Sequence, residues 1–255
     1  MMDYDTDWIE QNVARARALT DAFTASYAEP AMAHVSRAQL AAMIDHTILK
    51  PEATVDDVEA VCREAIAHRF ASVCVNACHV PQCVELLADE EPAICAVVGF
   101  PLGATLTEAK AYEADLAIAE GATEIDMVIN VGMLKSGAYG FVLDDIADVA
   151  DICHEADAIL KVIIETVLLS DIEKALACLL LAEAGADIAK TSTGFAGGGA
   201  TARDVALMRA AIGPELGLKA AGGIRDYQTA ALMVAAGATR IGASAGIKIV
   251  QGAPQ

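Results

Sequence analysis

The feature that most constrains the fold is a repeated alternation of short strand-like runs with helix-like segments from residue 43 onward. Eight runs are rich in apolar and β-branched residues, and helix signals lie between them. The runs span residues 43–49, 71–76, 94–100, 124–130, 160–166, 187–193, 216–222 and 239–244. Strands that alternate with helices form a parallel sheet, and eight such units favour a closed barrel over an open sheet. The sequence therefore predicts the α/β class, as a single (β/α)8 TIM barrel.

Capping residues mark where individual helices begin. Helices of the barrel are expected to open at Thr54, Thr107, Ser170 and Asp226, and three of them to close at Gly121, Gly185 and Gly237. Upstream, the apolar spacing over residues 6–28 predicts a helix, and Ser36 with Gln39 predicts the start of a second. We therefore expect three segments, which are an N-terminal helical extension (1–42), the barrel domain (43–250) and a short tail (251–255).

Charge and composition exclude several classes of function. The chain has 255 residues, of which 55% are hydrophobic, and its formal net charge is −19. Such an acidic protein lacks the basic surface that a phosphate backbone requires, so nucleic acid is not an expected partner. No apolar run is long enough for a transmembrane helix, and the first residues lack the order of a signal peptide. We expect a cytoplasmic protein with no membrane partner, and a homo-oligomer, either a dimer or a tetramer.

The cysteines and histidines do not indicate a metal centre. Seven cysteines are present, which is an odd number, and without a secretion signal a disulfide framework is not expected. Cys74, Cys78 and Cys83 are close in sequence, but no second ligand pair with zinc-like spacing follows them. No two of the five histidines are paired at metal-binding spacing. We therefore expect neither a metal ion nor a cofactor.

Alternation within each strand predicts which side chains face the lumen of the barrel. Helices cover the outer face of a parallel barrel, so the apolar side chains of each strand point outward and the polar ones point inward. In residues 124–130 this rule directs Ile125 and Met127 outward. The side chains directed inward include Asp45, Cys74, Glu124, Asp126, Lys161, Glu165, Lys190 and Lys219.

Three lysines and two aspartates inside one barrel favour a catalytic site, with a structural ion network as the alternative. Each buried charge costs several kcal/mol unless it is well paired, so five charged side chains in one lumen need a functional or a structural reason. Burial and a neighbouring cation both lower the pKa of a lysine, and Lys190 and Lys219 lie on adjacent strands. A neutral amine can attack a carbonyl to form a Schiff base, and Asp126 is placed to move protons. This reasoning leaves open which of the two lysines is the nucleophile.

Glycine-rich loops after the last two strands predict a phosphate site. Residues 221–225 read AGGIR and residues 241–246 read IGASAG. Glycines let backbone N–H groups approach an anion, and these two loops often hold phosphate in a TIM barrel. Gly194 lies in a third possible wall, for which a flexible loop is the alternative. The candidate phosphate-binding residues are Gly194, Gly222, Gly223, Gly242 and Ser244.

Several segments together resemble the deoxyribose-phosphate aldolase family of class I aldolases. They include IDHTILKPEAT (44–54), VVGFPLGA (97–104), EIDMVIN (124–130), KTSTGF (190–195) and KAAGGIR (219–225). The resemblance runs in order over about residues 40–247. It implies a TIM-barrel enzyme that reversibly cleaves 2-deoxy-D-ribose 5-phosphate to D-glyceraldehyde 3-phosphate and acetaldehyde through a lysine Schiff base.

The resemblance also implies roles for individual residues. Lys190 would form the Schiff base, Asp126 and Lys219 would transfer protons, and Lys161 would shape the charge around them. From the strand alternation, and not from the resemblance, we expect Asp45 and Cys74 to be supporting residues, with the thiolate of Cys74 favoured by the lysines. The loops of Gly222–Gly223 and Gly242–Ser244 would hold the phosphate.

The chain departs from the family at two positions of the phosphate site. Phe195 stands where some members carry a lysine, and Ala245 where some carry a second serine. Both departures remove possible phosphate contacts. Two rival functions remain open at this stage. One is a lysine-dependent aldolase or transaldolase for another sugar phosphate, and the other is a catalytically silent barrel that binds a phosphorylated sugar.

Overall fold

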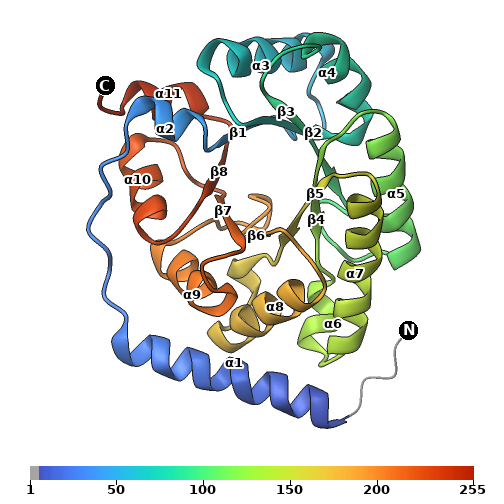
Figure 1. Ribbon diagram of the computed structural model, residues 1–255, viewed down its shortest axis with the longest axis vertical. Helices are drawn as coiled ribbons and strands as arrows, with labels where there is room; N and C mark the ends of the chain where they lie inside the picture. Colours follow the sequence, from blue (N-terminus) through green and yellow to red (C-terminus); the bar gives the residue numbers. More distant parts are fainter. Residues whose placement is uncertain (1–5) are drawn as a thin grey trace.

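Eight parallel strands close into a barrel in which neighbours in space follow the order of the chain (Figure 1). The structure, a computed structural model, describes residues 6–255. The strands are β1 (Ile44–Thr47), β2 (Ser72–Asn76), β3 (Ala93–Val98), β4 (Glu124–Val128), β5 (Ile159–Ile163), β6 (Ile188–Lys190), β7 (Gly217–Ala221) and β8 (Arg240–Ala243). The pairing of β1 with both β2 and β8 closes the sheet, which confirms the predicted barrel.

Helices surround the barrel and cover its outer face (Figure 1). They are α3 (Val55–His68), α4 (Val80–Leu86), α5 (Thr107–Ala119), α6 (Val131–Lys135), α7 (Tyr139–Glu155), α8 (Asp171–Glu183), α9 (Ala202–Ile212), α10 (Tyr227–Ala235) and α11 (Gly246–Gln251), with short 3-10 turns at Ala77–His79 and Thr166–Leu168. The caps expected at Thr54, Ser170 and Asp226 are present. A helix also begins at Thr107 as expected, and the Thr107 hydroxyl donates to Asp145.

The strand faces follow the predicted alternation. Ile125 and Met127 of β4 belong to the large apolar core shared with the helices, whereas Asp126 forms ion pairs inside the barrel. A second, smaller group of buried side chains packs against Phe100 and consists of Leu49, Cys74, Cys95 and Val97. Polar groups therefore share the lumen with a limited apolar filling.

Two helices precede the barrel, α1 (Thr6–Ser26) and α2 (Arg37–Ala41). Helix α1 lies along α8 and α9 at the lower edge of Figure 1. Its buried residues on this side include Ala16 and Thr20, and the guanidinium of Arg203 lies over the ring of Phe23 at 5.3 Å. Helix α2 packs against α11, and the N–H of Arg37 donates to the carbonyl of Pro254. The extension and the C-terminal tail are thus both attached to the barrel.

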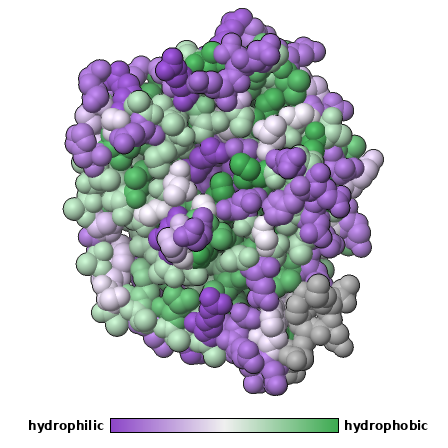
Figure 2. Space-filling view, in the orientation of Figure 1, coloured by the Kyte–Doolittle hydropathy of each residue, from purple (hydrophilic) through white to green (hydrophobic). Residues whose placement is uncertain are grey.

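The surface carries the excess of acidic residues. Figure 2 shows hydrophilic side chains mainly along the top and the right of one face, with broad areas of mostly weakly hydrophobic side chains at the left and in the middle. Within residues 6–255, no helix combines the length and the apolar character needed to cross a membrane.

A fully buried ion pair outside the lumen connects α5 to α7. The Lys110 ammonium donates to Asp145 Oδ2 at 2.5 Å and to the carbonyl of Val128 at 2.8 Å. The Thr107 hydroxyl donates to the other oxygen of Asp145 at 3.0 Å. Because Val128 ends β4, this pair joins two helices to a strand that carries a lumen residue. Removing one charge would leave its partner buried without compensation.

We expect Lys110→Met to lower the free energy of unfolding by about 3–5 kcal/mol, because the Asp145 carboxylate loses its cation. Chemical denaturation measures this loss. The double variant Lys110→Met with Asp145→Leu removes both charges and should recover most of the stability. A double variant as unstable as the single one would show that the charges do not account for the effect.

Candidate active site

The lumen cluster is assembled by the register of four adjacent strands. Lys190 of β6 is paired directly with Lys219 of β7, and Asp126 of β4 is paired with Lys161 of β5. In a parallel barrel, side chains at matching positions of neighbouring strands point the same way. All four side chains therefore enter the lumen, where all are buried. The structure brings together the residues that the alternation predicts.

The Asp126 carboxylate is the centre of this cluster. Its Oδ1 accepts a hydrogen bond from Lys161 Nζ at 2.7 Å. Its Oδ2 accepts from Lys190 Nζ at 2.6 Å and from Lys219 Nζ at 2.7 Å. One carboxylate thus contacts three ammonium groups, and the two candidate nucleophiles share a single oxygen atom. A proton can pass between Lys190 and Lys219 through that oxygen.

A second layer of charges surrounds the first. Lys219 Nζ lies 2.5 Å from Asp45 Oδ2, and Lys161 Nζ lies 2.7 Å from Glu124 Oε2. Arg240 contacts the carboxylates of both Asp45 and Glu124. In this cluster four cationic side chains share three carboxylates, and the seven residues are Asp45, Glu124, Asp126, Lys161, Lys190, Lys219 and Arg240. An acidic protein therefore contains four basic side chains clustered in its lumen.

The carboxylates decide the protonation of two of the lysines. Burial alone lowers the pKa of Lys219, but the carboxylates of Asp126 and Asp45 outweigh burial, and the pKa is raised above its ordinary value. Burial likewise lowers the pKa of Lys161, but Asp126 and the other anionic neighbours raise it well above its ordinary value. The expectation that the paired lysines lower each other's pKa is therefore wrong for Lys219. The sequence did not reveal that Asp126 lies between the two amines.

Asp126 itself is held in its charged form. Burial raises its pKa, but the ammonium groups of Lys161, Lys190 and Lys219 outweigh burial and hold the pKa well below its usual range. The carboxylate is therefore ionised at neutral pH. It can accept a proton only when the charges around it change during a reaction.

Lys190 differs from the other two lysines in its access to the cavity. A cavity of about 580 Å³ opens at the ends of the strands, and Lys190 forms part of its wall. The Lys190 residue is 3% exposed, whereas Lys161 and Lys219 are fully buried and are not part of that wall. A small molecule in the cavity would meet the Lys190 amine first. This difference bears on the choice that sequence reasoning left open.

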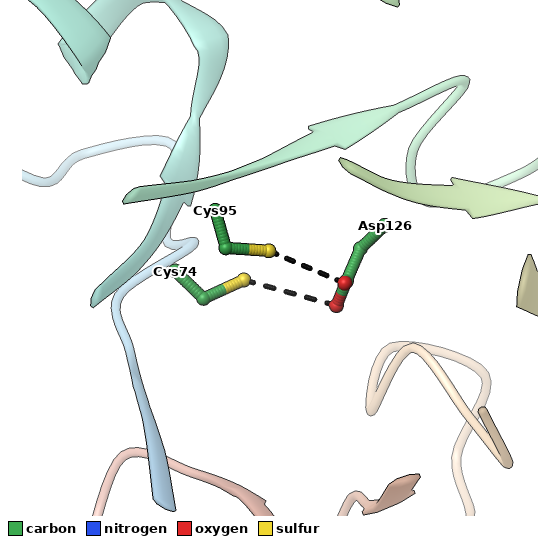
Figure 3. A group of neighbouring side chains, drawn as sticks. All are labelled: Cys74, Cys95 and Asp126. Carbon is green, nitrogen blue, oxygen red and sulfur yellow. Dashed lines mark hydrogen bonds between the residues drawn. The ribbon is translucent and has the colours of Figure 1, made fainter. Parts of the chain in front are cut away.

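Two thiols lie against Asp126 from β2 and β3 (Figure 3). The Cys95 thiol donates to Asp126 Oδ1 at 3.2 Å and accepts from Lys161 Nζ at 3.1 Å. Cys74 Sγ lies 4.0 Å from Asp126 Oδ2, which places it in the lumen as predicted. A hydrogen bond with Cys95 lowers the pKa of Cys74, whereas burial raises the pKa of Cys95 well above its ordinary value.

This group of two thiols and a carboxylate has ligand atoms close enough to hold a metal ion, but its charges do not suit one. Both oxygens of Asp126 already accept hydrogen bonds from ammonium groups. A metal cation there would also face three positive charges at short range. The cysteines that are close in sequence are separated in space, since Cys78 is exposed and Cys83 Sγ lies 3.8 Å from Cys62 Sγ.

The five candidate phosphate residues all line the cavity, as do Arg225 and Lys50. Two glycines permit close approaches that a side chain would prevent. A Cβ at Gly199 would lie 2.2 Å from the carbonyl oxygen of Gly222, and one at Gly242 would lie 3.0 Å from Lys219 Cε. Gly242 therefore also makes room for a lumen lysine. Phe195 is 51% exposed in the same wall, and its ring meets that of Phe100 edge-on at 5.3 Å.

Sequence reasoning overlooked three members of the site. Arg240 lies two residues before Gly242 on β8, so the alternation could have directed it inward. Arg225 follows the glycine pair in the same loop and also lines the cavity. Cys95 gave no readable signal, because residues 94–100 are apolar on both faces.

The depressed pKa of Asp126 predicts part of the pH dependence of stability. A carboxyl whose pKa is lower in the folded state stabilises the fold above its unfolded pKa of about 4, and this stabilisation disappears as pH falls through the folded pKa. Asp126→Asn keeps the shape and removes the charge. We expect its free energy of unfolding to fall less steeply than that of the parent below about pH 5. Denaturant titrations at a series of pH values measure the slopes.

The exposed Asp151 provides a matched control, because Asp151→Asn removes a surface carboxylate. The slope of its free energy of unfolding against pH should equal that of the parent. Parallel slopes for Asp126→Asn and the parent would contradict the assignment of acid sensitivity to Asp126.

Known proteins resemble the chain over most of its length. Residues 39–252 match the family described as DeoC/LacD family aldolase. Deoxyribose-phosphate aldolase 1 of Bacillus licheniformis is 58% identical over 214 residues, which cover 84% of this chain and 96% of that protein. The deoxyribose-phosphate aldolase of Thermococcus kodakarensis is 52% identical over 222 residues, which cover 86% of this chain and 99% of that protein.

Solved structures of aldolases share the fold. The tetrameric deoxyribose phosphate aldolase of Aeropyrum pernix superposes with a TM-score of 0.80 at 30% identity, covering 97% of both chains. The aldolase QR15 superposes with a TM-score of 0.79 at 38% identity, covering 83% of this chain and 94% of that one. The matched residues 39–252 include every strand of the barrel and the three lumen lysines, and the chain therefore belongs to the DeoC/LacD family of aldolases.

Proposed function

We propose that this protein is a class I aldolase that reversibly cleaves 2-deoxy-D-ribose 5-phosphate to D-glyceraldehyde 3-phosphate and acetaldehyde, with Lys190 as the Schiff-base lysine. The observation that carries the proposal is the position of the Lys190 amine, in the cavity wall and 2.6 Å from Asp126 Oδ2. The names of the relatives that match most of the chain support the choice of substrate. The raised pKa of Lys219 supports Lys190 as nucleophile, because a protonated amine cannot attack a carbonyl.

In the proposed reaction the neutral amine of Lys190 attacks the aldehyde carbon of the sugar and forms a carbinolamine. The hydroxyl of the carbinolamine takes a proton and leaves as water, which gives the iminium. The carbon–carbon bond between C2 and C3 then breaks, its electron pair forms an enamine with the iminium carbon, and the C3 hydroxyl loses its proton. Glyceraldehyde 3-phosphate leaves first. Protonation of the enamine at carbon and hydrolysis of the iminium then release acetaldehyde and restore Lys190.

Asp126 and Lys219 are the proposed proton carriers for these steps. Lys219 has the proton that the departing hydroxyl needs, and its Nζ lies 2.7 Å from the oxygen that also contacts Lys190. Asp126 can relay that proton along one hydrogen-bonded path. Lys161 lies on the far oxygen of Asp126 and keeps the carboxylate oriented.

The phosphate of the substrate would lie at the mouth of the cavity. Glycine N–H groups from the ends of β6, β7 and β8 suit an anion, and the Arg225 side chain adds a cation to the same wall. The cavity wall also contains the basic side chains of Arg225 and Lys50, which can pair with an anionic ligand in a protein whose net charge is −19.

Lys190→Met should abolish both cleavage and borohydride trapping with acetaldehyde, because methionine has no amine to form the iminium. In the parent, peptide mass mapping should find an ethyl group on Lys190 after reduction. Lys219→Met, measured in parallel, should cleave more slowly while still trapping on Lys190. An adduct on Lys219 would reassign the nucleophile, and no adduct on the parent would favour a silent sugar-phosphate-binding barrel.

Phe195→Lys should raise the preference for deoxyribose 5-phosphate over unphosphorylated deoxyribose. Phe195 lines the cavity wall, so a cation there gains a charge-assisted contact of about 1–3 kcal/mol, or roughly 5–150-fold in the ratio of kcat/KM values. Phe195→Leu removes the ring without adding charge and should leave this ratio near that of the parent. A ratio that Phe195→Lys does not change would place this position away from the phosphate.

A further inference from the structure

Glu165 is a buried carboxylate that the proposed reaction does not use. It follows β5 and is 2% exposed, yet it is not part of the cavity wall. Its backbone is left-handed, with φ of 57° and ψ of 67°, which is unfavourable for a residue with a side chain. Such a conformation persists only where surrounding contacts hold it, so the contacts of Glu165 call for a reason.

Those contacts converge on one residue of the neighbouring loop. The Thr193 N–H lies 3.2 Å from Glu165 Oε2 and 3.4 Å from Oε1, and the Thr193 hydroxyl donates to Oε2. The Thr193 hydroxyl oxygen in turn accepts from the N–H of Phe195 at 3.0 Å. Glu165 therefore fixes the backbone and the rotamer of Thr193 together, and Thr193 fixes the turn that follows.

That turn forms the β6 side of the cavity. Thr193, Gly194 and Phe195 all line the cavity, and Gly194 has a φ of 84°. A Cβ built on Gly194 would lie 3.8 Å from the Cα of Gly222, so the two glycine loops face each other closely. The separation of these loops sets the width of the proposed phosphate site.

Glu165 supplies an attachment in the middle of this loop, next to the contact between the hydroxyls of Ser192 and Thr166 at 3.3 Å. Thr191 exchanges hydrogen bonds with Ala221 of β7 through its hydroxyl, at 3.0 and 3.1 Å. At the far end, the N–H of Ala200 donates to the carbonyls of Ala221 and Gly222, both at 3.1 Å. Between these ends the segment 194–199 contains four glycines, which restrain the backbone weakly. Thr193 held by Glu165 is thus the attachment nearest to Gly194.

We propose that Glu165 is a positioning residue that acts through Thr193 to place Gly194 against the phosphate of the substrate. This inference rests on the proposed function for the identity of the phosphorylated ligand. Glu165 does not touch the reacting atoms. Its loss should widen the anion site and leave the Lys190 amine in place, because Lys190 is held separately by β6 pairing and by Asp126.

The test compares Glu165→Gln with the parent on two substrates. Glutamine keeps the shape but replaces the carboxylate with a neutral amide, so the contacts that Glu165 Oε2 accepts from the N–H and the hydroxyl of Thr193 lose their charge assistance. We expect kcat/KM for deoxyribose 5-phosphate to fall about tenfold, mainly through KM, while kcat/KM for unphosphorylated deoxyribose changes less than about twofold. Borohydride trapping of acetaldehyde on Lys190 should match the parent. Equal losses on both substrates would overturn the proposal.

A double-mutant cycle with Thr193 tests the route of the effect. Thr193→Val removes the hydroxyl that Glu165 accepts from, and Thr193→Ser keeps it. If Glu165 acts through Thr193, Glu165→Gln should cost less in the Val background, where only the Thr193 N–H still donates to Glu165, and the full cost should return in the Ser background. If Glu165→Gln costs as much in the Val background as in the parent, the effect of Glu165 does not pass through Thr193. Should Glu165→Gln fail to fold, the difference between Thr193→Val and Thr193→Ser in phosphate preference carries the same test.

Asp187→Asn is the matched control. Asp187 also accepts a backbone N–H beside β5, from Leu160 at 2.8 Å, but at the opposite end of the strand. Its phosphate preference should equal that of the parent. Calorimetry of inorganic phosphate binding tests the role of Glu165 independently of the aldolase activity. A parent without aldolase activity would refute the function, whereas equal phosphate affinity of parent and Glu165→Gln would refute the role of Glu165.

Discussion

The contact of one carboxylate with three ammonium groups is the constraint on which the rest of the lumen depends. Asp126 accepts from Lys161, Lys190 and Lys219, and each of those charges would be costly to bury alone. The arrangement requires β4 to β7 to keep their register, because a slip of one residue would turn these side chains toward the helices. Stability of the barrel and arrangement of the site are therefore set by the same contacts.

The three lumen lysines have identical side chains but different surroundings. Lys219 and Lys161 are surrounded by carboxylates that keep them protonated, while Lys190 reaches the cavity. A protonated amine can donate a proton, and an amine that meets the substrate can act as nucleophile. An anionic ligand can still pair locally with Arg225 and Lys50 of the cavity wall, although the net charge of the protein is −19.

Much of the fold and part of the site could be predicted from the sequence, for reasons that particular residues make clear. Alternation in β4 placed Asp126 inside because Ile125 and Met127 must face the helices. The capping boxes at Thr54 and Ser170 are local motifs, so they are readable without tertiary information. The same approach failed at Cys95, because residues 94–100 are apolar on both faces and show no alternation.

The sequence by itself determined the eight strand–helix units, the inward direction of the charged side chains and the family of the chain, since each depends on periodicity or on ordered motifs. Only the tertiary structure decided which groups meet. Lys190 was expected to lower the pKa of Lys219, but the carboxylates of Asp126 and Asp45 reach Lys219 from other strands and raise its pKa. Glu165 and Thr193 lie 28 residues apart, and their contact exists only because β5 and β6 are neighbours. Electrostatic energy depends on distances of a few ångströms across strands, and the linear sequence does not contain them.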